Sequence, residues 1–156
     1  MKILIMGSGA VGGYFGAVLH RSGHEVMFVA RDPHLAAIRQ QGLRIESVTS
    51  GNFLIHPSAT DRPDGSWTAD LVLYCVKGYD NPGAIAVMAP ACGEDTSVLT
   101  VQNGIRGGEE LASAFGRERM LLGLTYVDAV RREPGLVAEL GAPTRIVFGE
   151  EGGCQS

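Results

Sequence analysis

Three glycines near the start of the chain have the spacing that binds a dinucleotide. Gly7, Gly9 and Gly12 form the pattern Gly-x-Gly-x-x-Gly. An apolar run over 3–6 precedes it and a helical pattern over 10–19 follows, which is the order that a pyrophosphate site needs. The helix N-terminus offers free N–H donors and a partial positive charge to the anion. The residues predicted to bind the cofactor here are Gly7, Ser8, Gly9, Ala10, Val11 and Gly12.

The residue after the second predicted strand bears on the choice between NAD and NADP. The strand covers 25–30, and Arg31 stands about twenty positions after the last loop glycine, where NAD-binding domains carry an acid for the ribose 2′-hydroxyl. An arginine can instead hold a 2′-phosphate through a bidentate contact, which favours NADP(H). Asp32 would read the ribose if the register slips by one, but Pro33 favours Asp32 as a helix N-cap. The alternative for Arg31 is a solvated surface charge.

Two further polar residues follow predicted buried strands. Lys77 comes after the apolar run over 70–76, and Asn103 comes after the run over 97–101. Ligands of open α/β sheets bind at the carboxyl ends of the strands. Lys77 could hold a phosphate or a developing negative charge, and Asn103 could bind the nicotinamide ribose or a substrate oxygen. The competing interpretations are an ordinary surface lysine and an Asn-Gly turn.

Composition narrows the class of protein. The chain has 156 residues, which fits one domain, and 45% of them are hydrophobic. A net charge of −4 without a basic run argues against nucleic acid as the partner. Met1 leads straight into the first strand and no apolar run reaches membrane-spanning length, so we expect no signal peptide, no membrane partner and a cytoplasmic location. The histidines and cysteines lack the spacing of a hydrolytic triad or a metal site, so no metal is predicted.

The alternation of strand and helix patterns predicts an α/β fold. We expect a Rossmann-type, doubly wound, mostly parallel sheet with helices on both faces. The stretch over 43–56 alternates around a turn and suggests a hairpin, whereas 57–69 is expected to be a loop. The remaining expected strands are 2–6, 119–130, 135–140 and 145–148, and the expected helices are 10–21, 33–41, 84–91 and 109–115.

Several segments together resemble the N-terminal domain of the ketopantoate reductase (2-dehydropantoate 2-reductase) family. They are Met6–Gly16, Val29–Arg31, Cys75–Lys77, Gln102–Gly104 and Gly123–Gly135 with its paired Arg131 and Arg132. The resemblance covers nearly the whole chain. It implies a cytoplasmic oxidoreductase of pantothenate and coenzyme A biosynthesis that reduces 2-dehydropantoate to pantoate with NADPH.

The resemblance also assigns roles to individual residues. Arg31 would hold the 2′-phosphate, Lys77 would lie near the cofactor, and Asn103 would lie between cofactor and substrate. The family places a small residue beside the cofactor where this chain has the bulkier Val130. The family's proton-donating lysine and its companion glutamate come from a helical C-terminal domain. No catalytic residue is therefore assigned here.

The domain division expected from this resemblance is a dinucleotide-binding domain over 1–150, followed by the start of a linker over 151–156 to a missing C-terminal helical domain. The chain would then be the cofactor-binding half of the enzyme and inactive, or nearly so, alone. The alternatives are a reductase of another 2-oxo acid or ketone and a stand-alone nucleotide-binding regulatory module. Exposed sheet edges and the face that meets the second domain make a homodimer an open possibility, and we expect that face to be unusually apolar.

Overall fold

A seven-stranded sheet organises the computed structural model, which describes residues 1–102, 106–141 and 143–150. The spatial order is β11-β8-β7-β6-β1-β2-β5, and every neighbouring pair is parallel except β8 with β11. The mostly parallel sheet expected from the sequence is confirmed. Its strands are β1 (Lys2–Met6), β2 (Glu25–Val29), β5 (Ser58–Thr60), β6 (Ala69–Tyr74), β7 (Cys92–Thr100), β8 (Met120–Tyr126) and β11 (Arg145–Glu150).

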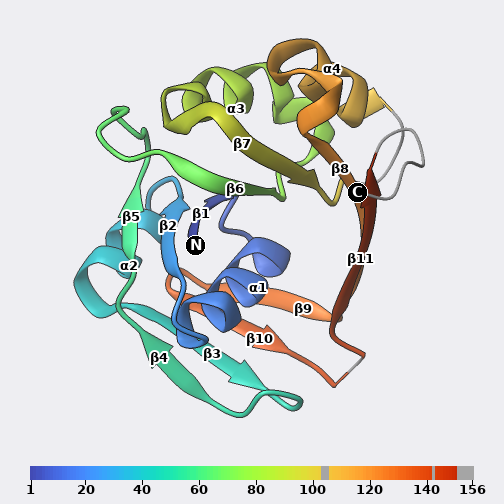
Figure 1. Ribbon diagram of the computed structural model, residues 1–156. Coiled ribbons are helices and arrows are strands. Elements are labelled where there is room, and N and C mark those ends of the chain that lie inside the picture. Colours follow the sequence, from blue (N-terminus) through green and yellow to red (C-terminus); the bar gives the residue numbers. More distant parts are fainter. Residues whose placement is uncertain (103–105, 142, 151–156) are drawn as a thin grey trace.

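Helices cover both faces of this sheet, as the sequence predicts (Figure 1). β1 is central and buried on both sides, and its side chains alternate between two cores. Ile3 and Ile5 pack on the α1 side together with Tyr14, whereas Leu4 and Met6 pack on the side of α3 and α4. The helices are α1 (Ala10–Arg21), α2 (His34–Gln41), α3 (Asn81–Met88) and α4 (Arg106–Phe115), with short 3₁₀ turns η1 (Gly78–Asp80), η2 (Ala89–Ala91) and η3 (Arg117–Arg119).

A second, four-stranded sheet lies on the outer side of α1, so that this helix is held between two sheets (Figure 1). Its order is β4-β3-β10-β9, built from β4 (Phe53–Ile55), β3 (Leu43–Ser47), β10 (Leu136–Glu139) and β9 (Ala129–Glu133). The parallel pairing of β3 with β10 joins segments that are far apart in the chain. The sequence predicts most of these strands individually, but it does not predict that they form a separate sheet.

Two expected elements are placed differently in the structure. The single strand expected over 119–130 is divided, because β8 ends at Tyr126 in the large sheet and β9 begins at Ala129 in the small one. Within the loop expected over 57–69, β5 adds an edge strand beside β2. The hairpin expected over 43–56 is confirmed as the antiparallel pair of β3 and β4.

The start of α2 also differs from expectation. The helix begins at His34, its N-cap is Pro33 in α-region backbone, and no side chain caps it. Asp32 is therefore not the N-cap. The first turn is closed by backbone bonds instead, since the N–H of Leu35 donates to the carbonyl of Arg31.

Candidate nucleotide-binding site

The turn between β1 and α1 has the close packing that the glycine pattern requires. Gly7 has a φ of +96°, and a Cβ there would lie 3.1 Å from the backbone of Cys75 at the end of β6. A Cβ at Gly12 would overlap the carbonyl oxygen of Gly7 and press on Ile5. Both positions therefore need glycine for the chain to turn and for α1 to pack on the sheet.

Gly9 differs from these two glycines because it faces open space. It is the N-cap of α1, and a Cβ there would meet no atom within 4 Å. No side chain caps α1 and its first turn contains no acidic residue. The first N–H groups of a helix have no partner within the helix, so this open end fits the pyrophosphate of a dinucleotide.

The neighbouring serine secures the loop. The Ser8 side chain is buried, and its hydroxyl donates to the carbonyl of Val29 at 2.8 Å. The Ser8 N–H donates to the same carbonyl at 3.2 Å. These bonds tie the glycine loop to the end of β2.

Arg31 and Lys77 lie at the same edge of the sheet as the glycine loop, at the ends of the two strands that flank β1. Both side chains are exposed. The guanidinium of Arg31 forms an ion pair with Asp80 of η1, with 3.7 Å between Nη1 and Oδ1. Asp80 is not among the residues predicted from the sequence, although its position three residues after Lys77 puts it near this edge.

Asn103 lies outside the described residues, but the residue before it is well anchored. The Gln102 side-chain amide donates to the carbonyl of Val76 at 2.6 Å and to Oδ1 of Asn81 at 2.7 Å. Asn81 is buried, accepts a bond from the Tyr74 hydroxyl and donates to Glu110. This network joins the ends of β6 and β7 to the starts of α3 and α4. No periodic pattern in the sequence indicates this network.

His34 is a second residue whose setting the sequence did not reveal. It is buried in the first turn of α2, and its Nδ1 accepts the N–H of Gly135 at 2.9 Å. Burial and the nearby Arg131 guanidinium lower the pKa of His34, while the backbone of Ser8 opposes them. The neutral imidazole therefore links α2 to the turn between β9 and β10.

Val130 lies on β9 of the small sheet, which packs against α1. It pairs with Ala138 and is 42% exposed. Its predicted place beside the cofactor stays a prediction.

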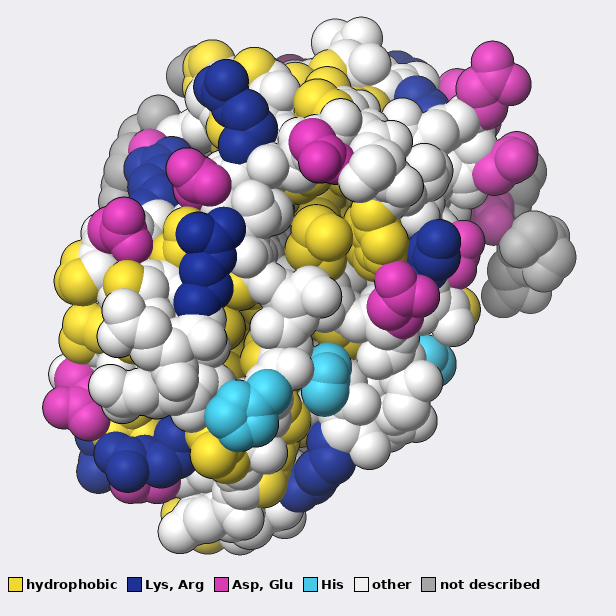
Figure 2. Space-filling view, turned by 90° about the vertical axis from the view of Figure 1, so that its left-hand side faces the viewer, with side chains coloured by type: hydrophobic (Ala, Val, Ile, Leu, Met, Phe, Trp, Pro, Cys, Tyr) yellow, Lys and Arg dark blue, Asp and Glu magenta, His cyan; other side chains and the backbone are white. Residues whose placement is uncertain are grey.

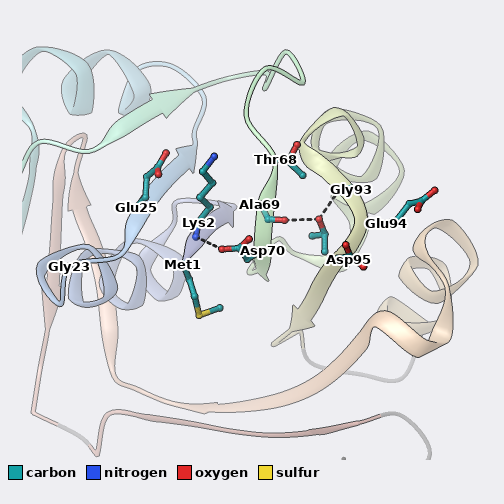
Figure 3. A pocket seen from close by; sticks show the side chains of 11 residues that line it. Met1, Lys2, Gly23, Glu25, Thr68, Ala69, Asp70, Gly93, Glu94 and Asp95 are labelled. Carbon is teal, nitrogen blue, oxygen red and sulfur yellow. Dashed lines mark hydrogen bonds between the residues drawn. The ribbon is translucent and has the colours of Figure 1, made fainter.

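A surface pocket lies at the opposite edge of the large sheet, where its strands begin (Figure 3). Two of its carboxylates have partners within the protein: Asp70 accepts the backbone N–H of Lys2 at 2.7 Å, and Glu25 accepts a bond from Trp67. In the part of the chain that the structure describes, no cluster of His, Cys, Asp or Glu could hold a metal. On the face formed by β5, α2 and β4, acidic and basic side chains are interspersed (Figure 2).

The model of one family, described as ketopantoate reductase PanE/ApbA, matches residues 3–153. The chain belongs to the ketopantoate reductase family. A 2-dehydropantoate 2-reductase of Pyrococcus horikoshii is 37% identical over 137 residues, which are 88% of this chain and 44% of that protein. The chain spans about half the length of the curated relatives it matches.

Solved structures of ketopantoate reductase relatives share the fold. The 2-dehydropantoate 2-reductase of Geobacter metallireducens GS-15 superposes with a TM-score of 0.92 at 37% identity, over all of this chain and 51% of that one. A D-mandelate dehydrogenase solved with NADH and anilino(oxo)acetate superposes with a TM-score of 0.85 at 26% identity, over 90% of this chain and 46% of that one. The solved structures that resemble this chain are thus named for different 2-oxo or 2-hydroxy acids.

One face of the large sheet is apolar and exposed at β8 and β11. Leu122, Leu124 and Tyr126 alternate along β8, and Val147 on β11 lies directly opposite Leu124. Residues opposite one another in an antiparallel pair share a face, so the four form one strip, which we call the β8–β11 strip. Each of these side chains is more than two-fifths exposed.

No helix in the described ranges is long and apolar enough to cross a membrane.

Proposed function

We propose that this chain is the NADPH-binding half of an enzyme that reduces 2-dehydropantoate to pantoate. The observation that carries the proposal is the open N-terminus of α1, flanked by Arg31 at the end of β2. Bound NADPH would supply a hydride to the ketone carbon of the substrate. In this assignment the loop over 7–12 holds the pyrophosphate and Arg31 holds the 2′-phosphate.

The remaining predicted residues act on the reacting end of the site. Lys77 has an exposed ammonium group at the end of β6, where it attracts the phosphates or the carboxylate of a 2-oxo acid. Asn103 would contribute hydrogen bonds to cofactor and substrate, and Val130 would line the cofactor from the small sheet. No residue of this chain is assigned as the proton donor.

The proton donor, a lysine with a companion glutamate, would lie in a C-terminal half such as the longer relatives have. The β8–β11 strip supports this division, because an apolar face of this kind is what a second domain would cover. The domain boundary then falls near residue 150, and the chain alone reduces substrate slowly or not at all.

Titration of the purified chain with NADPH and NADH, followed by nicotinamide fluorescence, tests the cofactor assignment. We expect NADPH to bind and to lose affinity in the Arg31→Ala variant, with little change for NADH. Binding of NADH alone would support the interpretation in which Asp32 reads the ribose, and with it a regulatory module. Ketopantoate-dependent oxidation of NADPH at the rate of a full-length reductase would contradict inactivity of the isolated half.

The second candidate is reduction of a different 2-oxo acid. The similarity to a D-mandelate dehydrogenase solved with NADH and anilino(oxo)acetate favours it. The two candidates share the nucleotide site and differ in the substrate pocket. Assays of the chain joined to a C-terminal half, with ketopantoate and with aromatic 2-oxo acids, would distinguish them.

A further inference from the structure

Arg31 and Asp80 meet across the carboxyl edge of the large sheet. Arg31 follows β2 and Asp80 ends the 3₁₀ turn after β6, while β1 and its glycine loop lie between these two strands. The ion pair therefore connects the two sides of the loop. Arg31 is the more exposed partner at 71% of its side chain, against 34% for Asp80.

The structure holds the Asp80 carboxylate in place through its backbone. The Asp80 N–H donates to the carbonyl of Lys77 at 2.9 Å, and the next residue, Asn81, is buried in the network with Tyr74 and Glu110. Burial raises the pKa of Tyr74, and the negative charges of Glu110 and Asp80 raise it further. The carboxylates of Asp80 and Glu110 are therefore close enough to act on Tyr74, and the Asp80 side chain makes no capping bond to α3.

A 2′-phosphate held by Arg31 would have to displace or share this carboxylate. The phosphate monoester carries a charge of about −1.5 to −2 at neutral pH, so it would compete with Asp80 for the guanidinium and be repelled by the carboxylate. NADH has a 2′-hydroxyl at the same place. A hydroxyl meets no such repulsion and can donate a hydrogen bond to a carboxylate.

We propose that Asp80 determines cofactor specificity by weakening the preference for NADPH that Arg31 confers. The inference rests on the proposed nucleotide site and extends it. Arg31 attracts the 2′-phosphate, Asp80 opposes it, and the balance leaves NADH as an accepted second cofactor.

Dissociation constants for NADPH and NADH, measured at one low ionic strength, test this balance in the wild-type chain and in Asp80→Asn. Asn keeps the size of the side chain and removes its charge. We expect Asp80→Asn to bind NADPH about threefold to tenfold more tightly, as the loss of an exposed ion pair and of a like charge allows. NADH affinity should stay the same or weaken.

A matched control is Glu94→Gln, which removes one negative charge from the opposite edge of the sheet. Its ratio of NADPH to NADH affinity should equal that of the wild type. In an Arg31→Ala background, Asp80→Asn should have a smaller effect on NADPH, because Arg31 is the group for which carboxylate and phosphate compete.

The outcomes separate the two proposals. Binding of NADPH with an unchanged NADPH-to-NADH ratio in Asp80→Asn would overturn the role of Asp80 alone. Equal changes for both nucleotides would also overturn it, since they would indicate a general effect on the site. Failure of the folded wild-type chain to bind either nucleotide would contradict the proposed function and this inference with it.

Discussion

The end of β10 and the start of α1 both offer hydrogen-bond donors to an anion, but they differ in whether the chain itself supplies the anion. At the end of β10, the buried carboxylate of Glu139 accepts bonds from the Ser47 hydroxyl at 2.7 Å, from the Thr49 N–H at 2.9 Å and from the Gly141 N–H. At the start of α1, a Cβ at Gly9 would meet no atom within 4 Å, and the helix has no acidic residue in its first turn and no side-chain cap.

The difference separates a structural anion site from the site that we propose for the nucleotide. Burial alone would raise the pKa of Glu139, but its three hydrogen-bond donors outweigh burial and lower the pKa to about 2. That carboxylate closes the turns at one end of the small sheet. The end of α1 has the same kind of donors and no acid of its own, which is what a site for an external anion requires. Four predictions test this comparison.

The largest effect is expected from Gly12→Ala. The new Cβ would overlap the Gly7 carbonyl oxygen, a backbone atom that cannot turn aside as a flexible side chain would. We expect the free energy of unfolding to fall by about 3 kcal/mol, the upper end of typical overpacking costs, and NADPH binding to be lost. Urea denaturation and the fluorescence titration measure the two effects. Wild-type stability in this variant would show that α1 does not pack on the loop as described.

Gly9→Asp would give the start of α1 a carboxylate of its own, as Glu139 provides at the end of β10. Gly9 has a φ of −74°, which any residue adopts, and space for a side chain. The carboxylate should cap α1 and leave stability unchanged or raised by a few tenths of a kcal/mol. It should weaken NADPH binding about 100-fold, because it would repel the pyrophosphate at close range.

The control for Gly9→Asp is Gly9→Asn, which caps the helix equally well without a charge. Asn should weaken NADPH binding much less than Asp. If the two variants bind NADPH equally, the anion does not lie at the end of α1, and the comparison between the two sites fails.

Glu139→Gln tests the site at the end of β10, where the chain itself supplies the carboxylate. Gln is nearly isosteric, but its amide group cannot accept from all three donors and places N–H groups against them. We expect the free energy of unfolding to fall by about 1–3 kcal/mol, with NADPH affinity unchanged. Weakened NADPH binding in a variant that remains folded would show that the two sites are coupled.

The sequence predicts the positions of the glycine loop and Arg31 better than the contacts of Glu139, for a physical reason. The glycine loop and Arg31 depend on local spacing within one strand–helix–strand unit, so their positions can be read along the chain. Glu139 meets Ser47 and Thr49 only because β3 and β10 pair, and no local pattern announces that pairing. The same reason applies to three other features that the sequence did not predict, because each depends on contacts between segments far apart in the chain. They are the small sheet, the division of the strand expected over 119–130 and the Arg31–Asp80 pair.

The smallest effect is a pH dependence of the difference in stability between the wild type and Glu139→Gln. The folded pKa of Glu139 is depressed to about 2 from an ordinary 4.5, so the carboxylate stabilises the fold fully above about pH 4.5. As the pH falls from there toward 2, the unfolded chain takes up a proton that the folded chain does not, and this contribution is lost. The Gln variant has no group there to titrate.

Chemical denaturation of both proteins at pH 7, 6, 5 and 4 measures this dependence. The difference should change little from pH 7 to about 5 and should be narrower at pH 4 by about 0.8 kcal/mol. A difference that stays constant at pH 4 and in further measurements toward pH 3 would mean that Glu139 has the same pKa in the folded and unfolded chain. A difference that widens as the pH falls would mean that burial outweighs the three donors and raises the folded pKa of Glu139. The end of β10 would then not be an anion site that can be compared with the end of α1.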